Sequence, residues 1–133
     1  MIEVTCAIIK KGNKVLVTQR SAQMDHPLQW EFPGGKMRMG ESPEKCIKRE
    51  IREELNVLVK VEQLLPSVMH HYAAHDPVKL IPFVCTIQEG EPQLSEHSDM
   101  RWLDCHELES LDMLEADVEI LQRLQGCQVW TCP

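Results

Sequence analysis

The sequence predicts an α+β sandwich, because several segments of strand character are interspersed with a few amphipathic helices. A second observation is length: we interpret residues 1–133 as a single domain, which is long enough to bury a sizeable core. A third is composition, since apolar residues make up 43% and charged residues 26% of the chain, a balance typical of folded globular proteins rather than disordered ones.

The N-terminal segment predicts three strands. Residues 2–9 are rich in Val, Ile and Thr, and the turn sequence KKGN separates them from a second strand over residues 14–20, which indicates a hairpin. Residues 29–32 predict a short third strand, which Pro33 and the two glycines after it end in a tight turn.

A helix is predicted from Ser42 to about Leu55. The serine is a good N-cap, and Pro43 stands in the first turn, where its missing N–H costs nothing. On a helical wheel Ile47, Ile51 and Leu55 fall on one narrow apolar stripe. We therefore expect this stripe to face the core.

The second half of the chain predicts further strands followed by two helices. The expected strands cover residues 56–65, 67–73, 78–88 and 100–104. Pro82 implies that its strand is an edge strand or carries a bulge. Asp104 and Glu107 predict a capping box for a short helix. Residues 115–125 predict an amphipathic helix with Gly126 as its stop signal.

Three glutamates share one face of the helix that starts at Ser42. Glu50, Glu53 and Glu54 lie within about 100° of one another on the wheel, and like charges at these spacings repel by about 0.2–0.5 kcal/mol per pair. A solvated surface helix is the simpler alternative, since four cations could neutralise the glutamates: Lys45, Lys48, Arg49 and Arg52. A divalent cation, Mg²⁺ or Mn²⁺, would instead turn the repulsion into coordination.

The residues before the helix favour the metal site. The sequence FPGGK ends a strand in a turn where glycine exposes backbone groups, and Lys36 is a candidate partner for a phosphate. A cation held by carboxylates beside open backbone, Lys and Arg is the arrangement that phosphoryl chemistry requires.

Charge and the start of the chain exclude other classes. A net charge of −7 argues against a basic nucleic-acid surface, so we expect no stable nucleic-acid complex. The first apolar run is too short for a signal peptide or a membrane span, so we expect a cytoplasmic protein, monomeric or homodimeric, without a membrane partner. The six cysteines form no CxxC pair, and we expect reduced, mostly buried thiols.

The spacing of these residues resembles the Nudix box. The matching positions are Gly35, Glu41, Arg49, Glu50, Ile51, Glu53, Glu54 and Val57. Asn56 departs from the pattern, which usually has glycine there, but asparagine also tolerates a left-handed backbone, so we expect the helix end to be preserved. The segments TQR, WEFPGGK, GEP, RWL and EADVEIL follow in the order seen in the MutT-like branch of the family. Within that branch the chain resembles the small mutator-type nucleoside triphosphate pyrophosphohydrolases, including those that act on CTP.

This resemblance implies the Nudix fold, a mixed β-sheet sandwiched between α-helices. It also implies Mg²⁺-dependent hydrolysis of a normal, oxidised or modified nucleoside triphosphate to the monophosphate and pyrophosphate, a reaction that cleans the nucleotide pool. Glu53 and Glu54 would be metal ligands, and Glu50 a ligand or the base that activates water. The Gly34 carbonyl and Glu96 would complete the metal site.

The resemblance assigns supporting and substrate-binding roles as well. Arg49 would orient the neighbouring glutamates, while Glu41 and Gly35 would shape the loop before the helix. Arg20 would contact the phosphates or the sugar, and Phe32 would lie in the nucleotide cleft.

Asp117 stands where oxidised-guanine enzymes of this branch often have asparagine. An ionised carboxylate only accepts hydrogen bonds, so Asp117 would suit the amine of cytosine, or a guanine if the carboxyl were protonated.

Two alternatives remain open at this point. One is hydrolysis of another nucleoside diphosphate-linked compound, which the short chain disfavours because it has little room for extra recognition loops. The other is a non-catalytic nucleotide-binding module, although such modules typically lose the box glutamates that are all present here.

Overall fold

The structure is a computed structural model that describes residues 1–71 and 76–127. These residues form eight strands and three helices, in chain order β1 (Ile2–Lys11), β2 (Lys14–Gln19), β3 (Trp30–Glu31), β4 (Gly34–Lys36), α1 (Pro43–Leu55), β5 (Leu58–Leu64), β6 (Val68–His70), β7 (Val78–Glu89), β8 (Asp99–Leu103), α2 (Cys105–Glu109) and α3 (Glu115–Cys127). Tyr72 and Ala73, the last two residues of one predicted strand, lie outside the described residues, as does Cys132, one of the six cysteines.

A long parallel pair of strands, β1 and β7, forms the centre of the sheet, in register from Ile2 opposite Val78 to Ile9 opposite Cys85. All other pairings between the strands are antiparallel: β4 pairs with β1, β5 and β6 pair with β7, and β2 extends from β1 to pair with β3 and β8. The sheet is therefore mixed.

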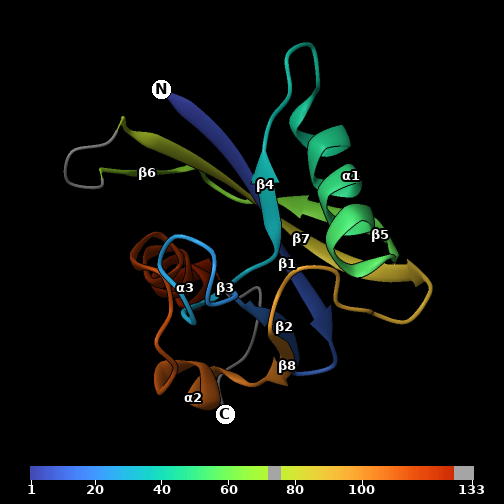
Figure 1. Cartoon of the computed structure of the whole chain (residues 1–133), viewed down its shortest axis with the longest axis vertical. Helices are drawn as coiled ribbons and strands as arrows, with labels where there is room; N and C mark the ends of the chain where they lie inside the picture. The colour runs from blue at the N-terminus through green and yellow to red at the C-terminus, as the bar shows by residue number, and fades with distance from the viewer. Residues whose placement is uncertain (72–75, 128–133) are drawn as a thin grey trace.

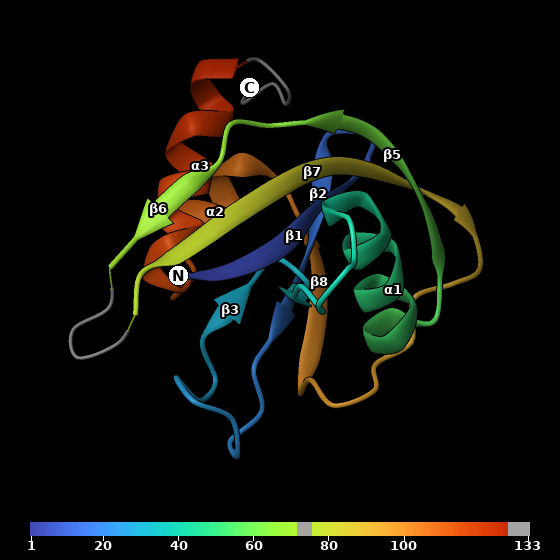
Figure 2. The ribbon, with the colours of Figure 1, turned by 90° about the horizontal axis from the view of Figure 1, so that it is seen from above.

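Helices cover both faces of this sheet, as Figures 1 and 2 show, with α1 on one side of β1 and β7 and α3 on the other. The stripe of Ile47, Ile51 and Leu55 is buried and packs into the cluster that contains Ile9 and Phe83. A second cluster lies on the α3 side and includes Ala116 and Ile120. The predicted α+β sandwich with a mixed sheet between helices is confirmed.

Both ends of α1 follow the sequence prediction. The Ser42 hydroxyl accepts a hydrogen bond from the Lys45 backbone N–H at 3.2 Å, which satisfies one free donor of the first turn. At the other end Asn56 adopts the left-handed conformation (φ 55°, ψ 38°), and its N–H donates to the Arg52 carbonyl at 3.0 Å. Asparagine thus does at this position what glycine does in the usual box.

Two details differ from the prediction, and a third is met in one of its two alternatives. The glycines after Pro33 form strand β4 rather than only a turn, because they pair with Thr5 and Cys6 of β1. Pro82 lies in the interior strand β7 and not at a sheet edge, but the predicted alternative of a bulge is met, because the register of β7 against β5 shifts twice. Helix α3 continues through Gly126 to Cys127 instead of stopping there.

The thiol prediction holds only in part. Cys6, Cys46 and Cys85 carry free and buried thiols. Cys105 is disulfide-bonded, so the expectation of a reduced thiol is wrong at this position. Among the described residues, no helix has the length and hydropathy that crossing a bilayer requires.

Candidate active site

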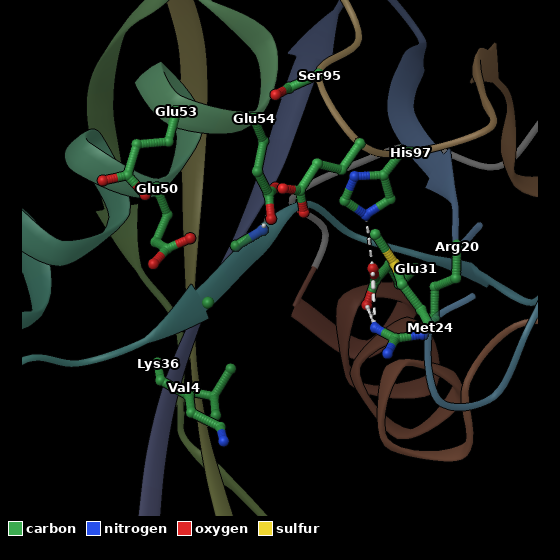
Figure 3. A pocket seen from close by; sticks show the side chains of 13 residues that line it. Val4, Arg20, Met24, Glu31, Lys36, Glu50, Glu53, Glu54, Ser95 and His97 are labelled. Atoms are coloured by element: carbon green, nitrogen blue, oxygen red, sulfur yellow. Dashed lines mark hydrogen bonds and ion pairs between the residues drawn. The ribbon is translucent and has the colours of Figure 1, made fainter. Parts of the chain in front are cut away.

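A cleft of about 480 Å³ opens beside strands β1, β3 and β4, between α1 and the loop before β8. Its lining brings together eight of the predicted site residues: Arg20, Gly34, Gly35, Lys36, Glu50, Glu53, Glu54 and Glu96. Figure 3 shows the three glutamates of α1 on one side of the cleft and Arg20 on the other. We call this space the acidic cleft.

Arg49 lies behind the acidic cleft and holds its glutamates in place. Its guanidinium donates to both oxygens of Glu41 at 2.7 and 2.9 Å, to Glu50 at 2.8 Å and to Glu53 at 3.2 Å. A further bond at 3.2 Å reaches the Lys36 carbonyl. One planar cation therefore fixes the positions of two cleft carboxylates relative to the strand that carries Lys36.

Glu41 is likewise outside the lining of the cleft and completes this network. Besides the two bonds from Arg49, its Oε1 accepts from the Arg38 backbone N–H at 3.1 Å. The hydrogen bonds from the Arg49 side chain and then from the Arg38 backbone lower the pKa of Glu41 to about 2. Glu41 is therefore a permanent anion that anchors Arg49.

The pKa of Glu54 is raised, in contrast to that of Glu41. Burial raises the pKa of its carboxyl to about 9, and the charges of Glu31, Glu50 and Glu53 raise it further. The Gly34 N–H donates a hydrogen bond to this carboxyl at 3.1 Å and partly opposes the rise of the pKa. No basic side chain is paired with Glu54 among the contacts of the described residues. In the metal-free protein the Glu54 carboxyl is therefore largely protonated at neutral pH, because no paired cation stabilises its ionised form.

The donor set fits a hard divalent cation. Such ions prefer carboxylate and carbonyl oxygens, and their charge would stabilise the ionised form of Glu54, which burial and the neighbouring carboxylates disfavour. In the described part of the chain, no three acidic, imidazole or thiol side chains are close enough together to form a complete site. The carboxylates of Glu50 and Glu53 are instead held by Arg49, and Glu53 also accepts from Arg38 at 3.3 Å.

The raised pKa of Glu54 predicts how stability depends on pH. Between about pH 4.5, the ordinary value, and about pH 9 the folded protein binds more protons than the unfolded chain, so the free energy of unfolding of metal-free protein should fall as pH rises. Urea denaturation with a chelator, repeated across this range, measures the slope. Glu54→Gln should make it shallower, whereas the exposed Glu44→Gln on the same helix should not. An equal slope in Glu54→Gln and wild type would contradict the prediction.

Close packing explains the two glycines beside the cleft. A Cβ atom at Gly34 would collide with the backbone of Thr5 in β1, and one at Gly35 would collide with the carboxyl group of Glu50. The second clash involves only a side chain. Gly35→Ala should therefore displace Glu50 and lower turnover by about tenfold or more while the protein still folds, and Gly34→Ala should lower the melting temperature more strongly. Similar melting temperatures and full activity in both variants would refute this explanation of the two glycines.

Phe32 and Asp117 lie in a smaller pocket of about 230 Å³ that adjoins the acidic cleft. Both side chains are buried, and Asp117 Oδ2 accepts from the Phe32 backbone N–H at 2.8 Å. Burial raises the pKa of Asp117 to about 8, with a further contribution from the charge of Glu31. At neutral pH this carboxyl is therefore largely protonated, so that it both accepts and donates hydrogen bonds.

Glu31 is an ionisable residue of the cleft lining that escaped the sequence analysis, whereas His97, next to Glu96 in the sequence, is expected near the mouth of the cleft and lies in its lining. Glu31 forms an ion pair with Arg20 at 3.1 Å and accepts from His97 Nε2 at 2.8 Å. The strand pattern could have indicated Glu31, because it alternates with Trp30 and Phe32, which are buried. His97 gives no local signal beyond its place next to Glu96.

The chain is similar to known proteins both in sequence and in fold. A sequence profile of the NUDIX domain matches residues 1–124. The chain is 34% identical over 130 residues to the CTP pyrophosphohydrolase of Escherichia coli K12, covering 92% of this chain and 90% of that protein. It is 30% identical over 128 residues to the 8-oxo-dGTP diphosphatase of Haemophilus influenzae, covering 93% of this chain and 91% of the relative. The crystal structure of a MutT NUDIX hydrolase from Burkholderia pseudomallei is similar with a TM-score of 0.85 at 25% identity, over 93% of this chain and 98% of that one.

Proposed function

This chain belongs to the NUDIX family, and we propose that it hydrolyses a nucleoside triphosphate to the nucleoside monophosphate and pyrophosphate with the help of Mg²⁺, or of Mn²⁺. The observation that supports this most directly is the acidic cleft, where five glutamates line the same space as Arg20 and Lys36, next to a pocket lined by Phe32 and Asp117. The relatives that act on CTP and on 8-oxo-dGTP point to the same class of substrate. A protein with such a substrate would act in the cytoplasm.

Oxygen ligands for the cation are available on both sides of the cleft. We assign them to Glu50, Glu53, Glu54, the Gly34 carbonyl and Glu96. A divalent cation at such a site supplies charge neutralisation for the polyphosphate and promotes deprotonation of water.

We assign phosphate binding, proton transfer and orientation to side chains of the protein. Arg20 and Lys36 bind the phosphates as cations, and Glu50 accepts the proton of the water that attacks phosphorus. The bond between that phosphorus and the oxygen that bridges the α- and β-phosphates breaks, and the products are the nucleoside monophosphate and pyrophosphate. Arg49 keeps Glu50 oriented, since its bond to the Glu50 carboxylate is 2.8 Å long.

Base selection is assigned to Asp117. In its protonated form the carboxyl is able to donate to a carbonyl oxygen of a base, such as that of guanine, and to accept from an exocyclic amine. As the pH rises through about 8 the donor is lost, so substrates that need it should lose kcat/KM relative to CTP.

Asp117→Asn should abolish this pH-dependent change in preference, because the amide keeps its donor at every pH. Turnover of CTP and of GTP, each measured from pH 6.5 to 9 in wild type and variant, tests the assignment. An identical substrate ranking in both proteins at all pH values would show that Asp117 does not contact the base.

The function itself is tested by a substrate screen with Mg²⁺. Normal, oxidised and methylated nucleoside triphosphates, a nucleotide sugar and a dinucleotide are incubated with the protein, and pyrophosphate and orthophosphate are measured separately. Release of pyrophosphate from triphosphates supports the proposal. Cleavage of the linked diphosphates alone would identify the other kind of hydrolase, and binding without turnover would identify a non-catalytic module.

A further inference from the structure

The acidic cleft and the smaller pocket meet at a shared wall. Four residues line both spaces: Val4, Arg20, Glu31 and Gly34. If the phosphates occupy the cleft and the base occupies the pocket, the sugar that joins them must lie at this wall. The inference below therefore rests on the proposed function.

Glu31 is the hydrogen-bond acceptor among these shared side chains. Val4 is apolar, Gly34 has no side chain, and the guanidinium of Arg20 only donates. The charge of Glu31 is, after burial, the largest cause of the raised pKa of both Glu54 in the cleft and Asp117 in the pocket. Both spaces therefore lie within electrostatic reach of this one carboxylate.

We propose that Glu31 binds a hydroxyl group of the nucleotide sugar and so selects substrates that carry it. A carboxylate has about four acceptor positions. Arg20 Nη1 approaches both oxygens, at 3.1 and 3.2 Å, and His97 Nε2 approaches Oε2 at 2.8 Å. Acceptor capacity for one more donor is left, and a sugar hydroxyl is the donor that a nucleotide presents between its base and its phosphates.

Two flanking residues fix the direction of this carboxylate. The Arg20 Nε also donates to the backbone carbonyl of Asp25 at 2.6 Å, which holds the guanidinium in place. The His97 side chain is only 5% exposed, and its Nδ1 has no hydrogen-bond partner among the described residues. Glu31 is thus the polar anchor of the His97 ring, and Figure 3 shows Arg20 and His97 reaching it from different segments of the chain.

His97 is a positioning residue in this arrangement, because it acts on the sugar only through Glu31. Its Nε2 must carry a hydrogen, since the carboxylate that faces it accepts and does not donate. The glutamate held between two donors loses little conformational freedom when the sugar binds, which favours selectivity.

The test compares three triphosphates of the same base: the ribonucleotide, the 2′-deoxynucleotide and the 2′,3′-dideoxynucleotide. Wild type should prefer the form that carries the bound hydroxyl over the form that lacks it by about tenfold to a hundredfold in kcat/KM, the value of a hydrogen bond to a charged group. Glu31→Gln should reduce this ratio severalfold, and Glu31→Ala should bring it close to one. Circular dichroism checks that each variant is folded.

The His97 position supplies an independent readout. His97→Leu removes the donor and should lower the hydroxyl preference, whereas His97→Gln retains a side-chain N–H and should restore most of it. A merely structural role for His97 would change turnover of all three triphosphates alike and leave the ratio unchanged.

The outcomes separate the two proposals. If wild type hydrolyses triphosphates but shows equal kcat/KM for all three sugars, or if Glu31→Gln and His97→Leu keep the wild-type ratio, the role of Glu31 is overturned while the proposed function stands. If wild type releases pyrophosphate from no triphosphate, the proposed function fails and the inference fails with it.

Discussion

Glu53→Gln is expected to lower the rate of pyrophosphate release by about two to four orders of magnitude, without loss of the fold. The Glu53 side chain is 48% exposed, so its replacement by an isosteric amide disturbs no packing. The amide has no charge to hold a cation, and the oxygens of the polyphosphate would then lose part of their neutralisation. Glu50→Gln should show a loss of the same order, because the amide cannot accept the proton of the attacking water.

The dependence on Mg²⁺ separates these two roles. A lost ligand weakens cation binding, so high Mg²⁺ should restore part of the activity of Glu53→Gln. Glu50→Gln loses the base as well as a ligand, so it should stay inactive at every Mg²⁺ concentration, because added cation does not restore a proton acceptor. Glu44→Gln, on the exposed side of α1, is the matched control and should behave as wild type. Wild-type turnover in both site variants would remove the proposed mechanism.

Arg49→Lys should reduce kcat by about tenfold to a hundredfold, the usual cost of losing a residue that orients metal ligands. The guanidinium of Arg49 donates to three carboxylates and one carbonyl at once, and its pKa is raised above the ordinary value of arginine, first by the hydrogen bond to Glu41. Lysine keeps the charge but has no planar fork, so it cannot span Glu41 and Glu50 together.

The control for this prediction is Arg52→Lys, one turn further along α1, where the side chain is exposed. Turnover at saturating substrate and thermal denaturation are measured for both variants. Arg49→Lys should lower kcat and the melting temperature together, whereas Arg52→Lys should change neither appreciably. An Arg49→Lys enzyme with the kcat of wild type would show that the network serves stability alone.

The sequence predicts best those features that depend on neighbours along the chain. The helical period alone places Glu50, Glu53 and Glu54 on one face, and all three line the acidic cleft. The caps at Ser42 and Asn56 are likewise local, since each satisfies a backbone group three or four residues away. These features could be predicted because a helix repeats the same geometry at every turn.

Tertiary structure alone decided which distant residues meet. The bond between the Phe32 N–H and Asp117 spans 85 positions, and the bond between His97 and Glu31 spans 66. No local period encodes such contacts, because they follow from the pairing of β2 with both β3 and β8 and from the packing of α3 on the sheet. The raised pKa values of Glu54 and Asp117 arise in the same way, since burial and the charge of Glu31 exist only once the chain is folded. The sequence by itself thus determined the acidic face of α1, and folding determined the wall of the cleft that stands opposite it.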